Sequence, residues 1–190
     1  IDISDCSLRQ LSHLLSIVLT SRPDVPNLRV DEVVGMGRSP YTDFWGKLST
    51  EDKRVVEESL CMMGVSQLSK RNLGTLSDGE CQKVMIAKAL AQQTSIIFLD
   101  EPTAFLDYPS KVEMLQLLRN LAHNLGKTVF LSTHDVEMAL QLSDRIWLMQ
   151  AGRFETGTSH ELAAKGSLSQ FIDRKGIRLD KDSLSIKMES

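Results

Sequence analysis

The sequence is poor in cysteine, in aromatic residues and in excess charge of either sign. Its 190 residues hold three cysteines, Cys6, Cys61 and Cys81, an odd number at wide spacings that fits neither a disulfide framework nor a zinc site. Cysteines used in this way are typical of a reducing cytosol. The net charge of -3 argues against nucleic acid as a partner, because phosphate backbones are bound by basic faces.

Long apolar runs are absent as well. No run approaches the roughly 18–20 residues that span a bilayer, so no membrane helix is expected. The composition, with 42% hydrophobic and 25% charged residues, is that of an ordinary globular protein of one domain or two closely joined lobes. The chain starts at Ile1 instead of a methionine, and residues 1–3 resemble the end of a strand. We therefore expect a piece of a longer protein.

Helical and strand patterns divide the chain into two kinds of region. Apolar residues at helical spacing and capping boxes predict helices, and short apolar runs predict strands, that at 15–19 being buried. The run at 95–99 is continuously apolar, as expected for a parallel sheet covered on both faces. The expected helices cover residues 7–15, 30–37, 49–64, 77–93, 107–126 and 136–142, with a last one capped by Thr158 and Glu161. The expected strands cover residues 15–19, 95–99, 128–132, 145–149 and 153–156, with a hairpin turn at 151–152. Residues 38–47 are expected to form an aromatic loop, and the tail from Lys175 is expected to be polar and marginally ordered.

Two carboxylates follow the most apolar strand. Asp100 and Glu101 come directly after residues 95–99. In open α/β sheets ligands bind beyond the carboxyl ends of the strands, where one carboxylate can hold Mg²⁺ and the next can orient an attacking water. We assign Asp100 to the metal and Glu101 to the catalytic base. The alternative is a strand-end turn with two solvated acids.

A short polar segment opens the helix at 77–93. Ser77 and Glu80 form a capping box, and Gly79 permits close approach of a ligand to a helix end that favours anions. On its own this pattern is an ordinary helix cap. Further along, Asp107 precedes a helix and also suits a cap, and His134 follows the strand at 128–132, although a lone histidine is more often structural.

The motif G-x-x-x-x-G-K-[ST], which cradles phosphate in many nucleotide-binding proteins, does not occur in these residues. Gly126-Lys127-Thr128 matches its last three positions, but Leu121 stands where a glycine is required. The context is also reversed, since Gly126 ends a helix and Thr128 begins a strand. We interpret these residues as a helix C-cap.

Four segments together resemble the motifs of ABC-type ATPases. They match, in order, the signature, Walker B, the D-loop and the switch histidine, at residues 76–80, 95–103, 106–107 and 132–135. Three further segments, 33–41, 45–46 and 48–52, are similar to the importer subunits that serve ferric siderophores, ferric citrate, haem and cobalamin. The resemblance covers nearly all of residues 3–171.

The resemblance implies an α/β fold with a RecA-like P-loop NTPase core and an inserted helical subdomain. The core is incomplete in these residues, because its N-terminal strands and phosphate loop are not among them. The resemblance implies four parts. Residues 1–29 are a part of the α/β core with the Q-loop region, and residues 30–93 are a helical subdomain that ends in the signature helix. Residues 94–172 are the α/β core with Walker B, D-loop and switch histidine, and residues 173–190 are a polar tail.

The implied activity is ATP hydrolysis with ATP and Mg²⁺ as cofactors, coupled to uptake of an iron complex or cobalamin. By resemblance, Asp100 binds the metal, Glu101 and His134 are catalytic, and four residues bind ATP across a dimer: Ser77, Gly79, Glu80 and Asp107. Thr20 occupies the Q-loop position, where the family has glutamine. Threonine is shorter and cannot reach the same metal or water position. The expected consequence is either altered coupling between the γ-phosphate and the permease or substitution by Ser21 or a water.

The implied partners are a second ATPase subunit, here an identical one, membrane permease subunits near residues 18–41, and indirectly a substrate-binding protein. No nucleic acid is expected. The implied location is peripheral, on the cytoplasmic face of the cell membrane.

Other interpretations stay open at this stage. A soluble ABC ATPase of DNA repair or chromosome maintenance would carry coiled coils or zinc cysteines, and residues 30–70 have neither. A translation-associated ABC protein would need a second cassette, which only sequence beyond Ser190 would reveal. A catalytically dead fragment could serve as an interaction module alone. We expect the intact protein to be active and the 190 residues alone to be inactive.

Overall fold

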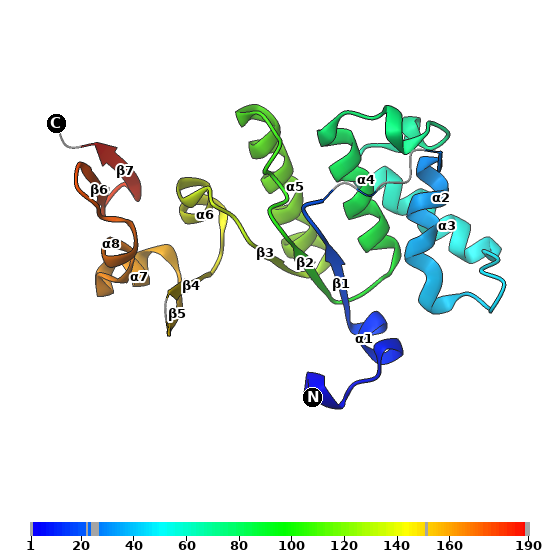
Figure 1. Cartoon of the computed structure of the whole chain (residues 1–190), viewed down its shortest axis with the longest axis horizontal. Helices are drawn as coiled ribbons and strands as arrows, with labels where there is room; N and C mark the ends of the chain where they lie inside the picture. Colours follow the sequence, from blue (N-terminus) through cyan, green and yellow to red (C-terminus); the bar gives the residue numbers. More distant parts are fainter. Residues whose placement is uncertain (1, 22, 24–26, 151, 189–190) are drawn as a thin grey trace. The chain divides into compact units, whose positions relative to one another are not determined.

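The structure, a computed structural model, describes residues 2–21, 23, 27–150 and 152–188 and is mixed α/β (Figure 1). The chain separates into two compact units, residues 1–132 and residues 133–190. Within the described residues, no helix is long and apolar enough to cross a membrane.

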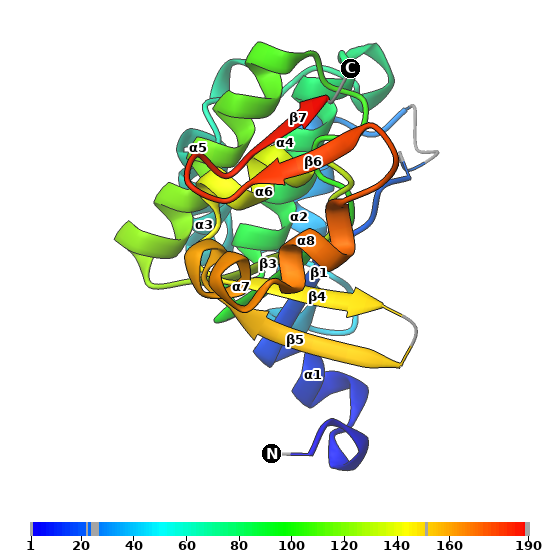
Figure 2. The ribbon, with the colours of Figure 1, turned by 90° about the vertical axis from the view of Figure 1, so that its left-hand side faces the viewer.

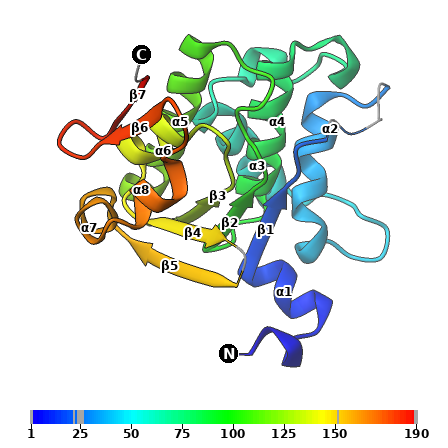
Figure 3. The same cartoon turned by 60° about the vertical axis from the view of Figure 1, so that its left-hand side comes forward.

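The first unit contains the predicted parallel sheet. Strands β1 (Leu15–Val18), β2 (Ile96–Leu99) and β3 (Thr128–Leu131) lie in the order β1-β2-β3, and both pairings are parallel (Figure 3). Val18 pairs with Leu99 and Leu99 with Leu131, so the three strands end at the same level. Their carboxyl ends therefore lie side by side and bring three separate loops together.

Two predictions are wrong for the described residues: that the strand at 95–99 is covered on both faces and that the strand at 15–19 is buried. Val18, Ile97 and Leu99 are at most 2% exposed, whereas Ile17 and Phe98 keep 60% and 38% of their surface. Phe98 stacks on Phe130 of the next strand, with ring centroids 5.1 Å apart. A continuous run of apolar residues indicates a strand, but it does not show that both faces of the sheet are covered.

The rest of the first unit is helical, and its elements are α1 (Leu8–Leu14), α2 (Val30–Gly35), α3 (Thr50–Met62), α4 (Asp78–Ala91), α5 (Tyr108–Leu125) and the 3-10 turns η1 (Ile3–Asp5), η2 (Met36–Tyr41), η3 (Ser66–Leu68) and η4 (Leu73–Thr75). Helix α4 packs against α2, α3 and β1, and α5 packs against β3. The predicted capping boxes at Ser49 and Ser77 are both formed. Gly126 ends α5 with φ 61°, which confirms the C-cap.

The helix expected over 30–37 ends two residues early, and a 3-10 turn occupies residues 36–41, where a loop from residue 38 was expected. Pro40 cannot donate a helical hydrogen bond. The backbone at Gly37 also lies so close to the Lys88 carbonyl of α4 that there is no room for a Cβ. Arg38 anchors the turn: its Nε donates to Asp52 Oδ1 at 2.8 Å and its Nη1 to the Ala91 carbonyl at 2.8 Å. The turn is thus fixed by close backbone packing and a buried ion pair.

The second unit consists of α6 (Val136–Leu142), β4 (Ile146–Gln150), β5 (Arg153–Gly157), α7 (Ser159–Lys165), α8 (Ser167–Ile172), β6 (Ile177–Asp180) and β7 (Ser185–Met188). Two antiparallel hairpins, β4–β5 and β6–β7, are visible in Figure 2. The first confirms the predicted hairpin, although Ala151 of its turn lies outside the described residues. In the described structure β4 pairs with β5 alone and is not part of the parallel sheet.

The expectation of a marginally ordered polar tail is wrong. Helix α8 and the β6–β7 hairpin come after the last predicted helix, and Leu179 and Leu184 join Leu162 and Leu168 in one buried cluster. The Ile186 amide also donates to Glu137 of α6 at 2.8 Å. Apolar residues do alternate with polar ones along residues 177–188, as in a strand with one buried face. The many charged residues among them make the segment polar in its overall composition.

Candidate functional site

The candidate site lies where the three parallel strands end. Backbone bonds continue the ladder past the strands, since the Asp100 amide donates to the Val18 carbonyl at 2.8 Å and the Ser132 amide to the Leu99 carbonyl at 3.0 Å. Thr20, Asp100 and Ser132 therefore come from three different loops to one edge of the sheet. This is the edge at which open α/β sheets bind ligands.

Asp100 is exposed and held on both carboxylate oxygens. The Thr20 hydroxyl donates to its Oδ2 at 2.7 Å, and the Ser132 hydroxyl donates to its Oδ1 at 2.8 Å. These hydrogen bonds, first that from Thr20 and then that from Ser132, hold the pKa of Asp100 below its usual range. Asp100 is therefore an anion at neutral pH, as a metal-binding carboxylate must be.

Glu101 has an unusual backbone conformation. Its φ is 48°, in the left-handed region that costs a residue with a side chain roughly 1–2 kcal/mol. Its amide donates to the Ser132 Oγ at 2.9 Å. Ser132 thus contacts both acidic residues, and the left-handed backbone turns the chain away from the strand direction directly after Asp100. Such strain is common at functional sites.

The signature segment forms the start of α4. The Ser77 amide donates to Glu80 Oε2 at 2.9 Å, and the Glu80 amide donates to Ser77 Oγ at 3.3 Å. The backbone hydrogen bond from Ser77 is the main reason that the pKa of Glu80 is lowered. A Cβ added at Gly79 would meet Leu106 at 3.4 Å, an ordinary contact, so packing within the chain does not by itself require glycine there.

The two remaining predicted residues differ in how they are placed. Asp107 caps α5, accepting from the Ser110 amide at 3.0 Å, and its hydrogen bonding with Ser110 is the main cause of its lowered pKa. His134 is exposed and belongs to the second unit, while Asp100, Glu101, Ser77 and Asp107 belong to the first. The structure thus brings the acidic pair together with Thr20, and it describes His134 only within its own unit.

The sequence pattern alone does not reveal that Ser132 and Thr20 contact Asp100. The approach of Ser132 to Asp100 depends on the parallel pairing of β3 with β2. Thr20, which by resemblance stands where the family has glutamine, is shorter than glutamine, and its hydroxyl contacts Asp100. Only their positions in the sequence could have indicated these contacts. Ser132 directly follows β3 and Thr20 comes shortly after β1, and both strands neighbour β2.

The residues present fit a magnesium ion that is held mainly by other groups. No cluster of three or more acidic, histidine or cysteine side chains that could hold a metal is found in the described part of the chain. Mg²⁺ commonly takes one or two carboxylates and fills its remaining positions with waters and phosphate oxygens. An exposed, anionic Asp100 with lone pairs to spare suits that arrangement.

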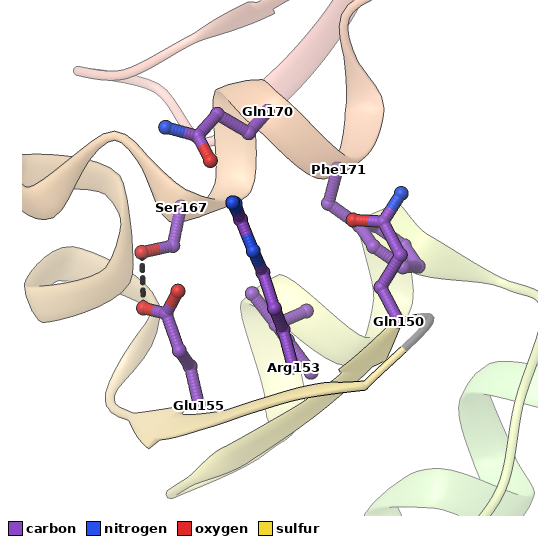
Figure 4. Close-up of a pocket in the computed structure, with 7 residues that line it drawn as sticks. Gln150, Arg153, Glu155, Ser167, Gln170 and Phe171 are labelled. Atoms are coloured by element: carbon purple, nitrogen blue, oxygen red, sulfur yellow. Dashed lines mark hydrogen bonds between the residues drawn. The ribbon is translucent and has the colours of Figure 1, made fainter.

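Two hollows in the described structure are lined by other residues. One of about 20 Å³ in the second unit is bordered by Arg153, Gln150, Gln170 and the Glu155–Ser167 pair, and it has room for little more than one water (Figure 4). The other, of about 420 Å³, is an open groove along α5 beside Met62. Neither includes a predicted site residue.

Comparisons with known proteins place the chain in a family. The ABC transporter family profile matches residues 1–104. An uncharacterised ABC transporter ATP-binding protein of Methanocaldococcus jannaschii is 40% identical over 148 residues, which are 78% of this chain and 51% of that protein. The petrobactin import ATP-binding protein of Bacillus subtilis is 33% identical over 90% of this chain and 68% of its own length. The cobalamin import ATP-binding protein of Halobacterium salinarum is 37% identical over 65% of this chain and 31% of its own.

Solved structures show the same fold. An ABC transporter described as of metal-chelate type, in an inward-facing conformation, superimposes with a TM-score of 0.78 at 24% identity, over 93% of this chain and 71% of that one. A dimeric ATP-binding cassette with ADP and phosphate gives 0.68 at 28% identity, over 82% and 69%. The chain spans about half the length of the Methanocaldococcus relative. The fold is that of a RecA-like P-loop NTPase with a helical subdomain, and the chain belongs to the ABC transporter family.

Proposed function

We propose that this protein is the ATP-binding and ATP-hydrolysing subunit of an ABC importer, which couples hydrolysis to uptake of an iron complex or cobalamin. The observation that carries the proposal is the pair Asp100–Glu101 at the carboxyl end of the central strand, with Asp100 anionic and exposed. The relatives named for petrobactin and cobalamin import support the transported class.

Each acidic residue takes one role. Mg²⁺, when bound, neutralises phosphate charge during phosphoryl transfer. Asp100 would hold that ion, directly or through water, and Glu101 would orient and deprotonate the attacking water. The backbone at Glu101 is in the left-handed region, with φ 48°, a conformation that is common at functional sites.

We assign the second half of the site to a partner subunit. In a homodimer, Ser77, Gly79 and Glu80 of one subunit would contact ATP held by the other, with Asp107 linking the two sites. The start of α4 supports this assignment because the N-terminus of a helix favours an anion. His134 would contact the γ-phosphate, and dimeric cassettes among the similar structures support such an assembly.

The remaining partners come from the importer assignment. Membrane permease subunits would bind near residues 18–41, a substrate-binding protein would act through them, and the protein would lie peripherally on the cytoplasmic face of the membrane. Thr20 would stand at the Q-loop, and the division into residues 1–29, 30–93, 94–172 and 173–190 would match the family's parts. The aromatic pair Phe44–Trp45, which follows these residues in the sequence, is 95% and 85% exposed.

The test is MgATP hydrolysis by the protein at its natural length. Glu101→Gln keeps the shape and removes the base, so kcat should fall roughly 10²–10⁴-fold. The control is Glu57→Gln, an exposed glutamate of α3, which should leave kcat unchanged. Absence of hydrolysis by the unmodified protein, or equal rates for both variants, would contradict the proposal. Uptake of labelled ferric siderophore and of cobalamin by cells with and without Glu101→Gln would separate the two substrate classes.

A further inference from the structure

The two hydroxyl groups around Asp100, those of Thr20 and Ser132, form a clamp. They arrive from opposite sides, because Thr20 trails β1 and Ser132 follows β3 while Asp100 follows the central β2. We propose that the clamp residues are positioning residues, which orient the Asp100 carboxylate for the metal. Ser132 also fixes the position of the Glu101 backbone relative to Asp100. This inference rests on the proposed function.

Ser132 uses its hydroxyl in both directions, as donor and as acceptor. A hydroxyl has one hydrogen and two lone pairs. Ser132 gives its hydrogen to Asp100 Oδ1 at 2.8 Å and accepts the Glu101 amide at 2.9 Å. One oxygen atom therefore joins the side chain of the metal-binding residue to the backbone of the base. A displacement of either acidic residue would break one of these two bonds.

Thr20 fixes the other side of the same residue. Its Oγ1 lies 2.7 Å from Asp100 Oδ2 and 3.0 Å from the Asp100 carbonyl oxygen, so its single hydrogen is shared between two acceptors of one residue. The methyl group of threonine restricts its χ1 rotation, which helps to hold the hydroxyl in place. Thr20 thus limits rotation of the carboxylate about its own bond.

The clamp leaves the charge of Asp100 available to a cation. A carboxylate has about four lone-pair positions, and the clamp occupies two. Both donors are neutral, and within the described residues Asp100 forms no ion pair that would compete with a metal. A lysine or arginine in either clamp position would orient the carboxylate equally well but would cancel its charge. Neutral hydroxyls orient the carboxylate and keep it able to attract Mg²⁺.

The first experiment measures hydrogen exchange at the Glu101 amide in the natural-length protein. Ser132→Ala removes its acceptor, so exchange should accelerate roughly five- to tenfold or more. Thr20→Val should leave that amide nearly unchanged, because Thr20 does not contact it. Ser95→Ala, at the opposite end of β2, is the matched control. Equal protection in Ser132→Ala and the control would overturn the role of Ser132.

The second experiment measures Mn²⁺ binding by electron paramagnetic resonance in the presence of a non-hydrolysable ATP analogue. Thr20→Val and Ser132→Ala should each weaken Mn²⁺ binding roughly five- to tenfold, and Thr20→Ser, which keeps the hydroxyl, should restore most of it. Unchanged or tighter binding by Thr20→Val, with normal binding by the unmodified protein, would overturn the inference alone. Failure of the unmodified protein to bind Mn²⁺ with the analogue would overturn the proposed function as well.

Discussion

At the scale of single residues, the most constrained polar group outside the candidate site is the buried pair Arg38–Asp52. Asp52 accepts from Arg38 Nε at 2.8 Å and from the Ser49 hydroxyl at 2.6 Å, and both side chains of the pair are less than 9% exposed. Hydrogen bonds from Ser49 and then from Arg38 lower the pKa of Asp52 to about 2. The pair joins α3 to η2, and Arg38 extends the link to the end of α4 through the Ala91 carbonyl.

This pair makes stability depend on acidity in a defined window. Because the folded-state pKa of Asp52 lies below its ordinary value of 3.8, its stabilisation is complete above about pH 4 and is lost as the pH falls towards 2. Asp52→Asn should cost about 3 kcal/mol at pH 7, because it leaves Arg38 buried without its counter-charge. Urea unfolding at pH 7 and at pH 2–4 measures both effects.

The matched control for that prediction is Glu51→Gln in the same first turn of α3. Glu51 pairs with Arg54, but both side chains are more than half exposed, and water and salt screen an exposed ion pair so that it contributes little to stability. If Asp52→Asn were no more destabilising than Glu51→Gln, or kept the same acid dependence as the unmodified protein, the buried pair would not be the link described.

At the scale of elements, a very close backbone contact joins η2 to α4. A Cβ built at Gly37 would lie 2.2 Å from the Lys88 carbonyl oxygen, which belongs to the backbone and cannot rotate away. Gly37→Ala should therefore force the two elements apart and destabilise the protein by about 1–3 kcal/mol. Thermal unfolding of the variant measures the loss.

Gly35→Ala is the control for Gly37→Ala. Its added Cβ would meet a Leu48 methyl at 3.0 Å, the end of a flexible side chain, and alanine is the better helix former inside α2 by about 1 kcal/mol. Its effect on the melting temperature should be small or positive. Equal losses for both variants would mean that the spacing of η2 and α4 does not depend on Gly37.

The same elements show what sequence alone could predict. Capping boxes and the Gly126 C-cap located helix ends because local hydrogen bonds decide them, and parallel pairing was predictable from alternating strands and helices. The end of α2 was not predictable, because it depends on Lys88, about fifty residues further along the chain. The β6–β7 hairpin was missed because its apolar positions are few and lie within a charged segment. At the site, the acidic pair was recognisable from spacing, whereas the roles of Thr20 and Ser132 depend on strand register.

At the scale of the whole molecule, the two units raise the question of what these 190 residues can do alone. The first unit contains Asp100, Glu101 and the signature helix, and the second contains His134. Neither contains a G-x-x-x-x-G-K-[ST] loop, whose backbone amides and lysine hold the β- and γ-phosphates. Under the proposed function, Asp100 and Glu101 would act on a phosphate that another element has to place, so the proposed catalytic pair and the phosphate-holding element would be separable.

We therefore expect the 190-residue chain alone to show no MgATP hydrolysis above background, while the natural-length protein hydrolyses ATP in a manner that requires Glu101. Phosphate release assayed side by side, with Glu101→Gln made in both forms, checks this. Hydrolysis by the 190-residue chain that disappears in Glu101→Gln would show that these residues hold the phosphates without the loop, and the two functions would not be separable. Hydrolysis that persists in Glu101→Gln would instead identify a contaminating ATPase, because the base assigned to the reaction is then absent.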